Sequence, residues 1–303
     1  MIRHEQPTYT LVERCCGSAA LTFHLLGARR PIVPYQGGKW RYRRELTALL
    51  AELGFHGPPS RVVLTDPGPW GRVVRVLLDL PRGSREETRK ILTRWSELEP
   101  RGVYDCLQGA ETAPEDDPTI DGPAAFAAEF LYLQRLAFSG KAVGIRNGRW
   151  SSPGFNKTSA YGTPGVPGRF GEIKPLPRAL ALRLGEYASW LPRLDADAVL
   201  TACTDARSNL DRDAESPHVE YIDPPYQSAT KYPGGHLDRS EVVALALAAQ
   251  ARGSAVIVSE AGPIAELVDR GWRTRCLREG TASGASPFKS RGAEWVTYTS
   301  GAT

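Results

Sequence analysis

The stretch VEYIDPPY at residues 219–226 decides the fold. It begins with residues that favour β structure and then stops at two prolines, as a strand does where it enters a loop. Six further segments have the composition of short strands: residues 9–13, 61–66, 198–203, 255–259, 272–277 and 294–299. Helical segments alternate with these runs towards both ends of the chain. The sequence therefore predicts an α/β fold with mainly parallel crossovers.

The overall composition is that of a globular protein. The chain has 303 residues, of which 41% are hydrophobic and 24% charged, and this balance excludes wholesale disorder. Its longest nearly apolar stretch, residues 242–251, is far shorter than the roughly 20 residues of a membrane span, and the N-terminus has no signal-peptide pattern. Five cysteines without a CxxC spacing indicate neither a disulfide framework nor a zinc site. We expect a cytoplasmic protein with no membrane partner and no metal.

The middle of the chain differs from its two ends. Helical periodicity dominates there, for example in residues 84–98. Two helix starts along the chain have capping-box spacing, Ser84 with Glu87 and Asp238 with Glu241. The sequence therefore predicts an α/β unit interrupted by a mainly helical insertion, with the following boundaries: residues 1–82 and 195–303 for the unit and 83–194 for the insertion.

Positive charge is unevenly distributed, although the net charge is only +4. Residues 29–44 hold six basic side chains and no acid, and residues 135–178 hold eight basic side chains against one acid, Glu172. The second stretch also contains several aromatic rings. Cations interleaved with flat rings suit a phosphate backbone and unstacked bases. A solvated, glycine-rich loop is the alternative interpretation.

The loop at Asp223 carries the clearest chemical signal. The Asp223 carboxylate and the Pro224 carbonyl can together accept both hydrogens of an exocyclic amine, because proline fixes the backbone and has no competing N–H. Tyr226 can stack on the base that carries this amine. The loop could therefore orient and polarise the amino group of a nucleobase. A turn stiffened by Pro224 and Pro225 after a strand is the structural alternative.

These motifs resemble those of the Dam-like DNA adenine-N6 methyltransferases. Besides DPPY, the segment VERCCGSAA at residues 12–20 is similar to the first-strand cofactor loop of that family, and PYQGGK at residues 34–39 is similar to its glycine-glycine-lysine segment. The resemblance implies a Rossmann-like S-adenosylmethionine-dependent methyltransferase sheet with an inserted, mainly helical target-recognition domain. The α/β unit would be the catalytic domain and the insertion would bind DNA.

The resemblance also assigns roles to single residues. It implies four catalytic residues: Asp223, Pro224, Pro225 and Tyr226. It implies that six residues contact S-adenosylmethionine: Glu13, Gly17, Ser18, Tyr35, Gly38 and Lys39. Asp66 ends an expected strand, where nucleoside-binding α/β folds hold ribose hydroxyls, and Asp205 is a candidate for the cofactor adenine. For Asp205, an ordinary surface aspartate is the alternative.

A further segment, RWSSPGFNKTSAYG at residues 149–162, resembles the DNA-reading hairpin of the family. Arginine and asparagine can form paired hydrogen bonds with the edges of guanine and adenine. The resemblance therefore implies DNA contacts from four residues: Arg149, Trp150, Asn156 and Lys157. Phosphate contacts are expected from three more: Lys141, Arg146 and Arg169.

The order of the motifs departs from the family pattern. Here the GGK segment follows the first-strand loop, whereas in the family it precedes that loop. We expect the pieces to meet around one cofactor all the same, because the chemistry depends only on their proximity. Arg14 and Cys15 replace a proline and a phenylalanine, and Ala19 replaces a glycine. Packing near the methionine part of the cofactor is therefore expected to differ.

The activity implied is site-specific transfer of a methyl group from S-adenosylmethionine to adenine N6 in double-stranded DNA. The enzyme is expected to be a monomer, with a cognate restriction endonuclease as a candidate partner. Cytosine N4 or an RNA base stays open as the target, because DPPY recognises an amine rather than one ring. A catalytically inactive, nucleic-acid-binding relative is a second alternative, suggested by Arg14 and Cys15. An enzyme of the same fold that acts on protein is a third, although its relatives carry asparagine at the position of Asp223.

Overall fold

The computed structural model describes the chain in a series of ranges. These are residues 9–33, 38–78, 82–113, 122–137, 141–156, 180–185, 199–202, 218–225, 237–278, 281–282, 290–291 and 293–299. Over these residues the main sheet has seven strands: β1 (Thr10–Arg14), β2 (Arg61–Thr65), β5 (Val199–Ala202), β6 (His218–Ile222), β7 (Ala255–Glu260), β8 (Arg273–Arg278) and β11 (Glu294–Tyr298). Two short strands, β9 (Thr281–Ala282) and β10 (Ser290–Arg291), form a separate antiparallel pair.

The strands of the main sheet lie in the order β5-β2-β1-β6-β7-β11-β8. All neighbours from β5 to β7 run parallel, whereas β11 is antiparallel to both β7 and β8. Counted along the chain, this is the doubly wound order 3-2-1-4-5-6 with a seventh, antiparallel strand between the fifth and the sixth. The winding direction reverses between β1 and β6. In such sheets, ligands bind at that switch point, outside the carboxyl ends of the strands.

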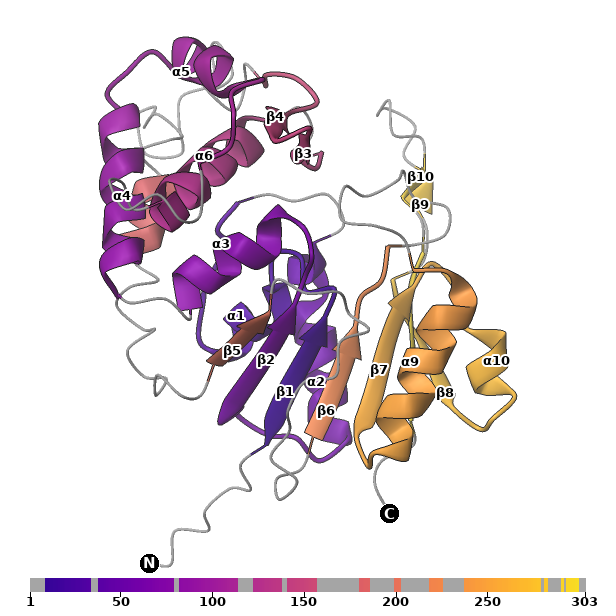
Figure 1. Ribbon diagram of the computed structural model, residues 1–303. Coiled ribbons are helices and arrows are strands. Elements are labelled where there is room, and N and C mark those ends of the chain that lie inside the picture. Colours follow the sequence, from indigo (N-terminus) through magenta and orange to yellow (C-terminus); the bar gives the residue numbers. More distant parts are fainter. Residues whose placement is uncertain are drawn as a thin grey trace, which may run out of the picture.

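Helices cover both faces of the sheet (Figure 1). On one face lie α1 (Ala20–Leu25), the 3-10 turn η1 (Lys39–Tyr42) and α2 (Arg43–Glu52), and they share a core with Tyr221 of β6. On the opposite face lie α9 (Arg239–Ala251) and α10 (Ala265–Val268), which pack around Ile222. Tyr221 and Ile222 belong to different cores because successive strand residues point to opposite sides of the sheet.

A helical layer lies beyond α3 (Pro69–Leu78), on the side of the carboxyl ends of the parallel strands (Figure 1). It contains α4 (Arg82–Trp95), α5 (Pro100–Leu107) and α6 (Gly122–Leu136). Helix α3 packs against both β5 and α6 and so joins the layer to the sheet. The joint is aromatic, because the ring of Trp70 lies 4.9 Å from that of Phe130 and the Arg72 guanidinium lies 3.4 Å above the ring of Phe126.

A β-hairpin completes the helical layer. Its strands, β3 (Gly144–Arg146) and β4 (Arg149–Ser151), pair in antiparallel fashion. The two residues between them, Asn147 and Gly148, both have positive φ angles, 49° and 71°. A two-residue turn that matches the twist of the strands requires positive φ at both positions, and asparagine-glycine favours it. The exposed Arg146 and Arg149 pair across the hairpin beside this turn.

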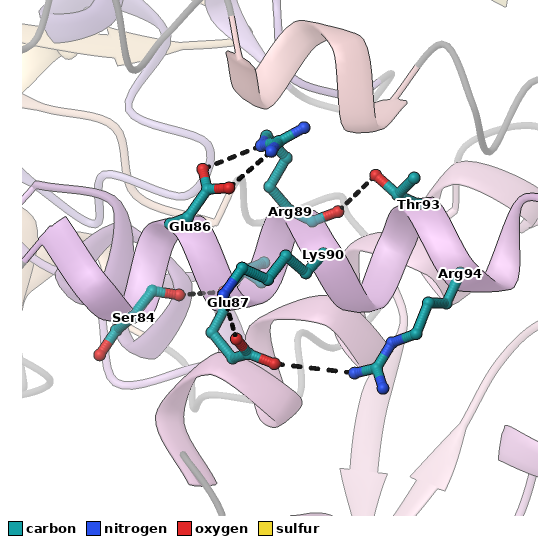
Figure 2. Close-up of polar contacts among 8 residues, drawn as sticks. Ser84, Glu86, Glu87, Arg89, Lys90, Thr93 and Arg94 are labelled. Carbon is teal, nitrogen blue, oxygen red and sulfur yellow. Dashed lines mark hydrogen bonds and ion pairs between the residues drawn. The ribbon is translucent and has the colours of Figure 1, made fainter.

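The two expected capping boxes have opposite outcomes. At the start of α9 the box is confirmed, since the Asp238 side chain accepts a hydrogen bond from the Glu241 backbone and the Glu241 side chain accepts one from the Asp238 backbone. At α4 the prediction is wrong, because the helix begins at Arg82 and Ser84 lies inside it. Figure 2 shows that Glu87 instead pairs with Lys90 and with Arg94 further along the helix.

The expected α/β fold with a mainly parallel sheet is confirmed. Helices α4 to α6 and the hairpin fall between β2 and β5 along the chain, where the insertion was predicted. The boundaries at residues 83 and 194 stay predictions. Within the described ranges, every helix is too short or too polar to cross a lipid bilayer.

Candidate active site

The loops after β1 and β6 lie side by side at the carboxyl edge of the sheet. Strands β1 and β6 are parallel neighbours, with Arg14 opposite Ile222. The Asp223 backbone N–H donates to the Arg14 carbonyl over 3.1 Å and so continues the ladder by one residue into the DPPY loop. The backbone N–H of Cys16 donates in the same way to the Thr65 carbonyl at the end of β2. Three strand ends are therefore tied together at the switch point.

The loop after β1 has an unusual backbone. Cys15, Gly17 and Ala19 have φ angles of 55°, 48° and 46°, all in the left-handed region. Glycine enters this region without cost, but a residue with a Cβ loses roughly 1–2 kcal/mol there. The surrounding contacts must therefore hold Cys15 and Ala19 in place. Such strained backbone is typical of ligand-binding loops.

Asp66 is one of the groups that order this loop. One carboxylate oxygen accepts the Gly17 backbone N–H over 2.9 Å, and the other accepts that of Gly68 over 2.7 Å. Burial raises the pKa of Asp66, and these backbone hydrogen bonds oppose the rise. Gly71 lets the helix that follows, residues 69–78, approach Asp66 closely, because a Cβ at this position would lie 1.9 Å from the Asp66 carbonyl oxygen. The residue expected to hold ribose hydroxyls therefore also fixes the loop that precedes α1.

Glu13 fixes the other side of the same loop. Its side chain is buried in β1, and one oxygen accepts both the backbone N–H and the hydroxyl of Thr22, over 3.1 and 2.6 Å. Burial raises the pKa of Glu13 to about 7, and nearby Asp223 adds to the rise, while the bonds from Thr22 oppose it. Ser18 lies half-buried between Glu13 and Thr22 along the chain. Glu13, in β1, is thus tied to Thr22 of α1 across the loop that contains Ser18.

The GGK segment reaches the DPPY loop in spite of its changed position in the chain. Gly38 directly precedes η1, and the Lys39 ammonium, which is buried, lies 2.9 Å from a carboxylate oxygen of Asp223. The same ammonium lies 3.5 Å from Glu294 at the start of β11. The expectation that the transposed segment meets the DPPY loop is therefore met by a direct ion pair.

The surroundings of Asp223 make its carboxyl group unusual. Burial is the largest effect and raises its pKa to about 6, while Lys39 lowers the pKa and Glu294 and Glu260 raise it. Pro224 is buried and Pro225 is half-buried. A carboxyl group with a pKa near neutrality can accept or release a proton close to physiological pH.

Among the residues that the structure describes, acidic groups outnumber basic ones around Lys39. Glu13, Asp223 and Glu294 carry three carboxyl groups at the carboxyl edge, and Glu260 at the end of β7 adds a fourth. Glu260 lies 3.7 Å from Arg239, so part of its charge is balanced. To the extent that they are ionised, the remaining acids favour a cationic ligand.

The hairpin residues expected at DNA fall into two groups. Lys141, Arg146 and Arg149 are exposed, and Arg149 forms an ion pair over 2.8 Å with the exposed Glu111. Trp150 is 2% exposed and belongs to the core of the helical layer.

Two aromatic rings and a carboxylate explain the place of Trp150. Its ring lies 4.9 Å from Phe126 and 6.0 Å from Phe130, and its indole N–H donates to Glu129 over 2.7 Å. Burial raises the pKa of Glu129, and the hydrogen bond from Trp150 opposes the rise. The expected contact between Trp150 and DNA is therefore corrected, because this indole packs inside the layer. Asn156 is half-buried, and its backbone N–H donates to the Leu136 carbonyl.

Five predicted site residues lie outside the described part of the chain: Tyr35, Lys157, Arg169, Asp205 and Tyr226. The sequence placed Glu294 at the start of the last expected strand and gave no sign that this residue belongs to the site. It also missed the buried ion pair between Arg14 and Glu220, at 2.8 Å. Arg14 directs its charge at a strand neighbour on the α9 side, so the replacement of the family's proline does not add a cation beside Asp223.

A scan of the chain against protein-family models finds no match, and a search of curated proteins finds no similar sequence. The function must therefore be argued from the site.

Proposed function

We propose that this protein transfers a methyl group from S-adenosylmethionine to the N6 amine of adenine in double-stranded DNA. The observation that carries the proposal is the position of Asp223 at the switch point, hydrogen-bonded to the end of β1 and ion-paired with Lys39 of the GGK segment. The strand order supports it as well, because it places the loops after β1 and β6 at the switch point, where ligands bind in such sheets.

The residues present fit S-adenosylmethionine. The cofactor is a sulfonium cation, and the excess of acids around Lys39 would stabilise its positive charge. The left-handed backbone at Gly17, held by Asp66, provides a place without a Cβ where the cofactor can approach closely. Glu13, Gly17, Ser18, Gly38 and Lys39 would hold it, with Asp66 placed for its ribose. When bound, the cofactor supplies an electrophilic methyl group.

Asp223 and Pro224 would position the target amine. The two hydrogens of the amine would be donated to the Asp223 carboxylate and the Pro224 carbonyl, which turns the nitrogen lone pair towards the methyl donor. As the new nitrogen–carbon bond forms and the carbon–sulfur bond breaks, positive charge develops on the amine. The Asp223 carboxylate stabilises this charge, and a pKa of about 6 lets it accept the departing proton. Lys39 must then either move away from the Asp223 carboxylate or bind this carboxylate together with the target amine.

The helical layer would hold the DNA over the site. It lies on the carboxyl side of the sheet (Figure 1). The exposed Arg146 and Arg149 belong to its hairpin. Exposed arginines suit phosphates and guanine edges. A target base must leave the duplex to reach a site at the strand ends, as in other enzymes that modify bases.

A labelling experiment tests the proposal. Purified protein is incubated with mixed-sequence duplex DNA and methyl-labelled S-adenosylmethionine, and modified positions are mapped. The Asp223→Asn variant, which keeps the shape but loses the charge, should incorporate label roughly 10–100-fold more slowly, since a hydrogen bond to a charged group contributes about 1.5–3 kcal/mol. Asp105→Asn on α5, an exposed aspartate paired with Arg101, is the matched control and should leave the rate unchanged. Equal rates for Asp223→Asn and the native protein would remove Asp223 from the mechanism.

The same experiment separates the alternatives. Label on cytosine N4, or on RNA in place of DNA, would change the substrate and keep the role of Asp223. Calorimetry with S-adenosylmethionine addresses the inactive relative, which would bind DNA and give no heat with the cofactor.

A further inference from the structure

Glu294 lies beside Lys39 because of the way β11 joins the sheet. It is two residues from Val296, which belongs to the same core as Tyr221 of β6 and Tyr42 of η1. Since strand residues two apart point to the same face, Glu294 lies on the η1 side of the sheet. The antiparallel direction of β11 brings this first residue to the edge where the parallel strands end.

The pairing between β11 and β8 is irregular at Glu294. Trp295 pairs with Cys276 of β8, whereas Glu294 pairs with Arg278, so the register shifts and Leu277 is skipped. Bulges of this kind are common beside active sites, where they redirect a side chain. Glu294 is 6% exposed, so its carboxylate is withdrawn from solvent at the point where the strand begins.

The contact between Glu294 and Lys39 changes the charge balance at Asp223. The buried Lys39 ammonium lies 2.9 Å from a carboxylate oxygen of Asp223 and 3.5 Å from one of Glu294. An ammonium group has three N–H donors, so it can bridge two carboxylates. With Asp223 alone, the lysine would cancel the charge of the aspartate. With both carboxylates ionised, one negative charge is left over.

Glu260, another acid at this edge, has different contacts. It lies 3.7 Å from Arg239, and one of its oxygens accepts the Ala261 backbone N–H over 2.8 Å. Glu260 therefore has a cation of its own, whereas Glu294 is paired with the lysine of the candidate site.

We propose that Glu294 is a positioning residue, which holds the Lys39 ammonium while Asp223 binds the target amine. This role rests on the proposed function, because it concerns the same methyl transfer. In the complex, Lys39 would pair with Glu294 and stay at the site, so that the Asp223 carboxylate keeps its charge for the amine. Positive charge that develops on the amine would then meet a carboxylate that no lysine cancels. Glu294 itself acts through Lys39.

A double-mutant cycle of methyl-transfer rates tests whether Glu294 acts through Lys39. Well above the pKa of Asp223, Glu294→Gln should lower the rate roughly 10-fold, the factor that corresponds to one pKa unit of electrostatic interaction. In the Lys39→Met background no ammonium is left to cancel the charge, so the same substitution should change the rate by less than about twofold. Glu52→Gln, which removes an acid paired with Arg275 of β8, is the matched control and should leave both rates unchanged. Equal slowing of both backgrounds by Glu294→Gln would overturn the proposal.

The pH dependence of the rate separates this role from a purely structural one. Five titratable groups interact electrostatically with Asp223: Lys39, Glu294, Glu260, Glu13 and Tyr221. Burial raises the pKa of Asp223, and Glu294 adds to the rise. Asp223 must be ionised to hold the amine, so the rate should increase with pH through this pKa, and Glu294→Gln should move the increase to lower pH. A variant that only loosens the fold would leave the midpoint in place, and that result would contradict the role of Glu294.

Unfolding in urea tests the shared lysine without any methyl transfer. In the Lys39→Met background the buried Glu294 carboxylate has lost this cation, which makes its burial more costly. The change in urea midpoint caused by Glu294→Gln at neutral pH should therefore be more favourable in that background than in the native chain. Equal changes in the two backgrounds would overturn the proposal even if the protein methylates DNA. Absence of label in DNA from the native protein would instead refute the proposed function, while the urea cycle still shows whether Glu294 holds Lys39.

Discussion

Replacing Glu13 with glutamine should stabilise the protein at high pH. The carboxyl group is 2% exposed and has a pKa of about 7, against an ordinary value of 4.5. Below pH 4.5 the group is neutral in both the folded and the unfolded chain. Between pH 4.5 and 7 only the unfolded chain loses the proton, so the native protein loses stability over this window, and above pH 7 the loss is complete.

The size of the effect follows from the shift. At 1.36 kcal/mol for each pKa unit, the raised pKa amounts to about 3 kcal/mol. Glutamine cannot ionise, and its carbonyl oxygen can still accept the hydrogen bonds from Thr22. The difference in unfolding free energy between Glu13→Gln and the native protein should therefore rise by about 3 kcal/mol, in favour of the variant, as the pH increases from 4.5 to 8.

Urea titrations at a series of pH values measure this difference directly. Titrations of all other groups are common to both proteins and cancel to first order. The exposed Glu266→Gln on α10 serves as the control for changing a surface carboxylate to an amide. A difference that stays constant with pH, or that falls as the pH rises, would refute the argument that Glu13 is held by burial in a raised-pKa state.

Three further changes have expected outcomes. Lys39→Met removes the cation that lowers the pKa of Asp223, so that pKa should rise above about 6 and the pH–rate profile should move to higher pH, with Lys90→Met on α4 unchanged. Trp150→Ala should lower the free energy of unfolding, measured in urea, by about 3–5 kcal/mol, because it empties part of an aromatic core. A variant that is fully stable but binds DNA weakly would instead restore the role of Trp150 as a DNA contact. Gly71→Ala should destabilise by roughly 1–3 kcal/mol in thermal unfolding, since its Cβ meets the Asp66 backbone, and native stability would show that α3 can shift.

The strands could be predicted because each is a short β-favouring run with clear ends. Their order in the sheet could not, since composition does not say which strands pair. This is why Glu294 was missed. It begins β11, and only the antiparallel direction of that strand brings its first residue to the edge where the parallel strands end.

A local motif predicted the structure correctly only where the neighbouring sequence favoured the same structure. Asp238 and Glu241 cap α9, whereas Ser84 and Glu87 have the same spacing inside a helix that starts earlier. Trp150 shows a different limit. Adjacent strand residues point to opposite sides, so Arg149 and Trp150 could not both face DNA, and the apolar ring took the core.

The short length of α1 explains why the transposed GGK segment still reaches Asp223. A helix that follows a strand usually carries the chain back to the opposite edge of the sheet. The six residues of α1 span about 9 Å, whereas the five residues of β1 span about 16 Å. Helix α1 alone is thus too short to cross the sheet, and after it Lys39 lies at the carboxyl edge again, beside Asp223. Helix α2, with ten residues and about 15 Å, then completes the crossing to β2. One crossover thus contains two helices, and the break between them is the place where a lysine can be brought to the site without any change in strand order.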